Sequence, residues 1–157
     1  MKILVVLAGL LFPALAQPAA AADAKVQDAI LQEINAFRAS AGLAPLRLEP
    51  RLSRAAEQHS RDMLARNFLS HQGSDGSDPG ARIARAGYRW RSYRENVGAG
   101  YMTMREAMAG WVQSPEHRAN LLAPDVTQVG VGFAGGPGMM PGNIPRTFWT
   151  LVLAAPR

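Results

Sequence analysis

The sequence predicts an α+β sandwich from helix-spaced apolar residues in its first half, helix-start signals in its middle and β-rich runs near its end. Apolar residues recur every three or four positions from Val26 to Ala41, so we expect an amphipathic helix that ends at Gly42. A second helix is expected to begin near Pro50, because proline suits the first helical turn. One face of this helix carries Leu52, Ala55, Ala56, His59 and Met63.

Three further helical segments begin with recognisable capping signals. Asp78-Pro79 predicts a short helix that stops at Gly87. Thr103 and Glu106 have the spacing of a capping box and predict a helix through Trp111. Ser114-Pro115 predicts a short helical turn that carries His117.

Strands are expected between and after these helices. Residues 88–97 alternate aromatic and charged side chains, and residues 128–133 and 147–153 are β-rich runs. Residues 135–145 are rich in glycine, proline and methionine, which predicts a long loop joining an antiparallel pair.

The N-terminus predicts export. Lys2 precedes an apolar run, residues 3–15, that is too short to span a bilayer, and Ala20-Ala21-Ala22 suits signal peptidase. We therefore expect a signal peptide over residues 1–22 and a domain over residues 23–157, with a cut after Ala16 as the alternative. No second apolar segment is long enough to span a membrane, so the expected location is secreted or periplasmic, not transmembrane after processing.

Composition narrows the class of partner. The chain has no cysteine, so neither disulfides nor a lipid anchored on cysteine stabilises or tethers it. The net charge of +5 comes mostly from single arginines without a dense basic run or interleaved aromatic residues, so nucleic acid is not expected as a partner. The charge is compatible with a weak attraction to anionic envelope polymers or lipid headgroups.

A set of short motifs follows in one order along the chain. They are Asn35-x-x-Arg38, Gly42-Leu43-x-Pro45-Leu46, His59-Ser60-x-Asp62-Met63, Ser70-His71, Glu95-Asn96-Val97, Trp111-x-x-Ser114-Pro115-x-His117-Arg118-x-Asn120-Leu121-Leu122, Val129-Gly130-Val131-Gly132 and Phe148-Trp149-Thr150. Together they resemble the CAP superfamily of cysteine-rich secretory, antigen 5 and pathogenesis-related proteins, in its bacterial secreted form. The resemblance covers residues 30–152.

The resemblance implies a three-layer α-β-α sandwich with a small antiparallel sheet and a large cleft. In animal and plant members that cleft carries two histidines and two glutamates. His71 and His117 match the two histidines and Glu95 matches the first glutamate, whereas residues 111–114 offer no acid for the second. The expected site therefore has three of the four residues. Asn96 and Asn120 flank it and are expected to fix loops against backbone groups.

The chemistry of this site has several interpretations. His71 and His117 could hold a divalent metal such as zinc, with Glu95 as a further ligand and one position open for water. The same residues could transfer protons without metal, or form a purely structural network. Ser70 beside His71 suggests a serine hydrolase, but adjacent side chains rarely face each other and no oxyanion hole is marked. His59 is expected to be a buried core residue.

The expected function is therefore binding of an extracellular or envelope ligand or partner, lipids included, through the cleft. The resemblance does not by itself identify an enzymatic activity. The alternatives are a metal- or histidine-dependent hydrolase of envelope peptide or glycan and a structural envelope protein.

Overall fold

The computed structural model describes residues 19–157, so most of the expected signal peptide, residues 1–22, lies outside the described residues. In chain order the elements are α1 (Ala19–Ser40), β1 (Arg47–Leu48), α2 (Pro50–Arg66), α3 (Pro79–Arg85), β2 (Trp90–Ala99), α4 (Met104–Gln113), α5 (Pro115–Leu121), β3 (Gln128–Met140) and β4 (Ile144–Pro156). None of the described helices is long and apolar enough to cross a membrane.

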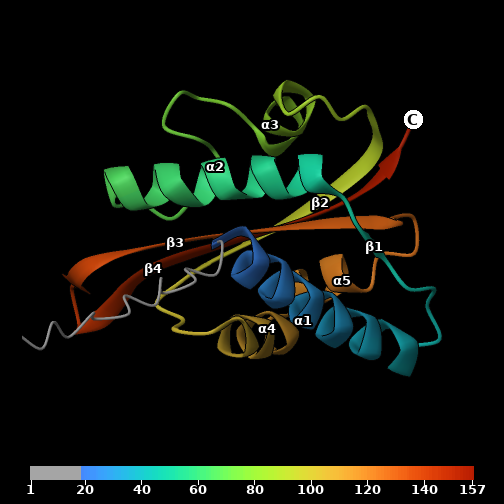
Figure 1. Ribbon diagram of the computed structural model, residues 1–157, viewed down its shortest axis with the longest axis horizontal. Helices are drawn as coiled ribbons and strands as arrows, with labels where there is room; N and C mark the ends of the chain where they lie inside the picture. The colour runs from blue at the N-terminus through green and yellow to red at the C-terminus, as the bar shows by residue number, and fades with distance from the viewer. Residues whose placement is uncertain (1–18) are drawn as a thin grey trace, which may run out of the picture.

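The elements form three layers around one sheet (Figure 1). The strands lie in the order β1-β3-β4-β2. Helices α2 and α3 cover one face, and α1, α4 and α5 cover the other (Figure 1). This confirms the expected α-β-α sandwich. The antiparallel pairs are β3–β4 and β2–β4, whereas β1 pairs with β3 in parallel, a strand that the sequence pattern missed because two residues show no alternation.

The expected helix starts are largely confirmed by their hydrogen bonds. Asp78 accepts a hydrogen bond from the backbone N–H of Ala81 at 2.7 Å, and Thr103 and Glu106 form a complete capping box. Pro50 occupies the first turn of α2, but the side chain that caps this helix is Glu49, which the sequence analysis did not single out. Ser114 stands at the N-cap of α5 without a side-chain capping bond.

The prediction of a long loop over residues 135–145 is wrong. β3 continues to Met140 and β4 begins at Ile144, so only residues 141–143 form the turn. The pairing shifts register between Gly135 and Met139, where Pro137 lies. β1 pairs only with the first two residues of β3, so this part of β3 has one open edge, where a residue without an N–H is tolerated. Glycine and proline content therefore did not exclude a strand.

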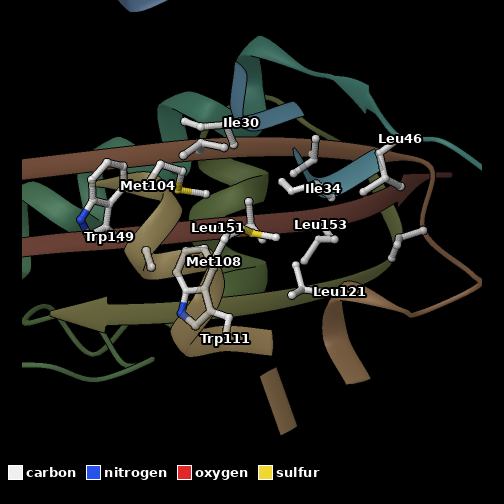
Figure 2. Close-up of a cluster of buried hydrophobic side chains, with 14 of the residues drawn as sticks. Ile30, Ile34, Leu46, Met104, Met108, Trp111, Leu121, Trp149, Leu151 and Leu153 are labelled. Atoms are coloured by element: carbon white, nitrogen blue, oxygen red, sulfur yellow. The ribbon is translucent and has the colours of Figure 1, made fainter. Parts of the chain in front are cut away.

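The larger part of the core lies between the sheet and the face covered by α1, α4 and α5. Figure 2 shows Ile30 and Ile34 from α1 and Met108 and Trp111 from α4 near the β4 side chains. These side chains are buried, and the indole N–H of Trp111 donates to the backbone carbonyl of Val97 at 3.1 Å. Burial of this apolar stripe fixes α4 beneath the sheet.

On the opposite face, two glycines allow α2 to lie directly on β3. A Cβ added at Gly130 would lie 2.1 Å from the backbone nitrogen of Ser53, and one at Gly132 would lie 2.2 Å from backbone atoms of Ala56 and Glu57. Neither neighbour can move without displacing the helix. The glycines in the Val-Gly-Val-Gly run therefore set the spacing between α2 and the sheet.

His59 is buried on the core-facing side of α2, as expected. The residue is only 1% exposed, and Nε2 lies 2.8 Å from the backbone oxygen of Ser70. Because a carbonyl only accepts, Nε2 carries the hydrogen. Burial, and then the positive charge of Arg82, lower the pKa of His59, so the ring is neutral at pH 7.

We predict that Gly132→Ala lowers the free energy of unfolding by about 3 kcal/mol, because the added methyl group overlaps the α2 backbone. The matched control is Gly138→Ala, which meets open space at a φ of +83° and should cost about 1 kcal/mol for its backbone conformation alone. Urea unfolding of both variants measures the difference. Equal losses would contradict the close contact between α2 and β3.

We also predict that His59→Ala destabilises the fold by about 3 kcal/mol, through a cavity and a lost hydrogen bond to Ser70. Gln58→Ala, at the neighbouring exposed position of α2, should change stability by less than about 0.5 kcal/mol. Thermal and urea unfolding provide the comparison. A stable His59→Ala protein would show that this histidine is not part of the core.

Candidate functional site

The candidate site is built on Glu95, a buried carboxylate in the middle of β2. One carboxylate oxygen, Oε2, accepts a hydrogen bond from Arg82 of α3 at 2.7 Å. The other, Oε1, lies 2.9 Å from Nδ1 of His71. Arg82 also donates to the backbone carbonyl of Ser77 at 2.9 Å. A continuous chain of charge-assisted hydrogen bonds thus joins α3, β2 and the loop between α2 and α3.

The exposed fraction of the side chains changes sharply along this series of hydrogen bonds. The side chains of Glu95 and Arg82 are 2% and 8% exposed, whereas the side chain of His71 is 54% exposed. The buried carboxylate therefore has a buried counter-charge, which such a group requires. His71 is held through Nδ1 at the protein surface. This leaves Nε2 as the ring nitrogen that can face a further partner.

His117 is positioned by a second set of hydrogen bonds between α5 and β2. The side-chain amide of Asn96, which is fully buried, donates to the backbone carbonyl of His117 at 3.0 Å. Asn120 donates to the backbone carbonyl of Glu95 at 3.2 Å and to the side-chain oxygen of Asn96 at 2.9 Å. The two asparagines therefore fix the helix that carries His117 against the strand that carries Glu95.

The two histidines have pKa values displaced in opposite directions. The hydrogen bond to Glu95 raises the pKa of His71, against the opposing effect of partial burial. Burial lowers the pKa of His117, and the positive charge of His71 lowers it further. The second effect places the two rings within electrostatic range of each other. Near the usual histidine pKa, His71 is therefore the more protonated of the two rings and His117 the less protonated one.

Of the residues expected from sequence, His71 and Glu95 are in direct contact, and Asn96 and Asn120 link Glu95 to the helix of His117. Arg82 was missed. It is one of many single arginines in the sequence, and nothing in its spacing distinguishes it from exposed ones. Glu116, beside His117, lies close enough for its charge to raise the pKa of both histidines, although its effect is the smallest in each case.

These contacts bear on two interpretations of the site, metal binding and a serine hydrolase that uses Ser70. Within residues 19–157, no group of three or more histidine, cysteine, aspartate or glutamate side chains is arranged to hold a metal ion. Both oxygens of Glu95 are already engaged, which leaves His71 and His117 as the imidazoles available to a metal. The hydroxyl of Ser70 accepts a hydrogen bond from the backbone N–H of Gln72 at 3.0 Å, and no bond between Ser70 and His71 is present among these residues.

The chain aligns with only part of two longer bacterial proteins. The chain is 33% identical over 104 residues to the Bacillus subtilis protein YkwD, covering 66% of this chain and 40% of that protein. It is 32% identical over 103 residues to the Bacillus subtilis membrane protein YlbC, covering 66% of this chain and 30% of that protein. The chain thus spans less than half the length of either relative.

Solved structures share the fold. An outer surface protein from Borrelia burgdorferi superposes with a TM-score of 0.72 at 18% identity, covering 85% of this chain and 94% of that one. An extracellular protein containing an SCP domain from Bacillus anthracis superposes with a TM-score of 0.68 at 25% identity, covering 94% of this chain and 45% of that one. The sequence profile of the cysteine-rich secretory protein family matches residues 31–152, and this chain belongs to that family, CAP.

Proposed function

We propose that this chain is an exported CAP-domain protein that binds a ligand or partner at the surface site formed by His71, Glu95 and His117. The observation that carries the proposal is the buried Arg82–Glu95 pair, which orients an exposed imidazole. Because Glu95 holds Nδ1 of His71 and Nε2 remains free to bond, this arrangement is suited to recognition of a ligand. Export is supported by the N-terminal signal pattern and by the extracellular and outer-surface proteins that share the fold.

The charges indicate what this site would recognise. Between the lowered pKa of His117 and the raised pKa of His71, His71 is an imidazolium whose Nε2–H is an outward donor, and His117 is a neutral ring. The buried Glu95 charge is already balanced by Arg82. A ligand that presents a carboxylate, a phosphate or another strong acceptor would therefore find a positive donor at His71.

The same pKa shifts predict how the site responds to pH. The raised pKa of His71 means that its bond to Glu95 stabilises the fold below about pH 6.5, and that this contribution is lost as pH rises through the raised value. The lowered pKa of His117 has the opposite effect on the pH dependence of stability. Its contribution is lost as pH drops from about 6.5 through the lowered value. Binding of a ligand that accepts a hydrogen bond should depend on the protonation of His71 and therefore weaken at high pH.

This proposal predicts that the pKa of His71 lies above, and that of His117 below, the usual value near ~6.5 in an NMR titration of the ring protons. Glu95→Gln should lower the pKa of His71 and also destabilise the fold, because it leaves the buried Arg82 charge unpaired, so the titration is read at a temperature where unfolding curves show this variant to be folded. Chemical-shift mapping with inorganic phosphate and with acetate should show changes around His71 that fade at high pH and disappear in His71→Ala. A response that is independent of pH and survives in His71→Ala would contradict the proposed site.

A metal-assisted form of the same site is the second candidate, favoured by the bond between His71 Nδ1 and Glu95. Metal-binding histidines commonly donate their other nitrogen to a carboxylate, which orients the ring. In that form His71 and His117 would hold the ion, with Glu95 orienting His71 and water completing the coordination. A bound zinc would supply a Lewis acid and a water of lowered pKa.

For the metal-assisted form, we predict that zinc raises the melting temperature of the purified domain and that this rise fades as pH falls through the histidine range near ~6.5, where protons compete for the imidazoles. Either His71→Ala or His117→Ala should abolish most of the rise, whereas Glu95→Gln should reduce it less. Differential scanning fluorimetry with zinc and with magnesium measures this. An undiminished rise in both histidine variants would locate the ion elsewhere and remove metal from this site.

A further inference from the structure

A second surface, separate from the histidine site, gathers arginines from three parts of the chain around the loop between α3 and β2. Arg51 and Arg54 of α2 donate to the backbone carbonyls of Gly87 and Ala86 at 3.4 and 3.3 Å. The backbone N–H of Arg157 donates to the carbonyl of Arg89 at 3.0 Å. We call Arg51, Arg54, Arg89 and Arg157 the arginine surface. All four residues are exposed.

Acidic residues neutralise little of this charge. Glu49 pairs with Arg51 at 2.8 Å. Across residues 19–157, no salt bridge involves the side chains of Arg54, Arg89 or Arg157. The charge of Arg54 also reaches Glu49, where it helps to lower the pKa of that carboxyl after the dominant effect of Arg51. The surface therefore has three exposed arginines without a salt-bridge partner among these residues.

A cavity of about 370 Å³ opens in this surface. It is lined by Ala84, Gly87, Tyr88, Arg89, Trp90 and Arg157. The exposed edge of Trp90 is held in place, because its indole N–H donates to the carbonyl of Gly80 at 3.2 Å and its ring packs edge-on against Tyr93 with centroids 4.7 Å apart. Both rings lie close to Gly80, where an added Cβ would be 3.0 Å from Tyr93 and 3.1 Å from Trp90. The lining of the pocket thus combines a tryptophan held in place with two arginines.

We propose that this pocket binds an acidic sugar unit of an anionic polysaccharide. The C–H face of a sugar ring packs against an aromatic wall, and a guanidinium binds a carboxylate in a bidentate manner. Arg51 and Arg54 extend the positive surface beyond the pocket, where further acidic units of a polymer would lie. The site is a hollow and not a protruding apolar surface, which favours a ring-shaped ligand over insertion into a membrane.

Intrinsic fluorescence gives a direct test, because the protein has three tryptophans and only Trp90 is exposed. Trp111 and Trp149 are 1% and 5% exposed, against 37% for Trp90. Titration of the mature protein with polygalacturonate should change the emission, and neutral dextran should not. The response should be absent in Trp90→Phe, whose affinity, measured by calorimetry, should also fall. Added salt should weaken binding, since the contacts are ionic.

A charge-matched pair of variants separates a specific site from general attraction to a basic protein. Arg54→Gln with Arg89→Gln should weaken binding by about tenfold or more, because two contacts to acidic groups are lost. Arg61→Gln with Arg66→Gln removes two exposed arginines from the other half of α2 and should change affinity by less than about twofold. Unfolding curves of both double variants confirm that each is folded.

Three results would overturn the proposal. Equal weakening in both double variants would show non-specific charge attraction. Binding to vesicles containing phosphatidylglycerol, with no binding to polygalacturonate, would identify a lipid surface as the partner. Absence of any response to polygalacturonate at low salt would remove the acidic sugar. Because His71 and His117 do not line this pocket, none of these results would bear on the histidine site.

Discussion

The ion pair between Arg82 and Glu95 is the interaction on which the candidate site depends. Both side chains are almost fully buried, so each needs the other to offset the loss of hydration. Each side chain also makes a second hydrogen bond, since Arg82 donates to Ser77 and Glu95 binds His71. The pair joins a helix, a strand and the loop between α2 and α3. Glu95 also binds Nδ1 of His71 and raises the pKa of this ring, against the opposing effects of burial and of the Arg82 charge.

The surrounding layers hold this pair in place without contributing to its chemistry. Gly130 and Gly132 let α2 rest on β3, which positions the loop that follows α2 and carries His71. On the other face, Asn96 and Asn120 tie α5 to β2. Arg38, although charged, is buried in a structural role and donates to the backbone carbonyls of Leu121 and Ala123 at 2.8 and 2.9 Å. Buried polar residues thus join the layers alongside the apolar core.

Much of this arrangement could be predicted from the sequence, for reasons that differ between elements. The helix starts at Asp78 and Thr103 follow local rules, because the capping side chain lies within three residues of its partner. His71, Glu95 and His117 were singled out by the order of motifs shared with a family, not by local pattern. Arg82 was missed because its importance comes from burial against a residue 13 positions away, and no local rule marks it. The extension of β3 through Pro137 was missed because the partner strand β4, not composition, determines it.

The most direct measurement is the tautomer of His71, read from the ¹⁵N chemical shifts of its ring at a pH above its pKa. If Glu95 orients this ring, the neutral form carries its hydrogen on Nδ1, which donates to the carboxylate and leaves Nε2 as a bare acceptor. The account predicts the Nδ1–H tautomer in the wild type and its loss in Glu95→Gln. A neutral His71 with its hydrogen on Nε2 in the wild-type protein would show that Glu95 does not set the orientation of the ring, and would contradict the account.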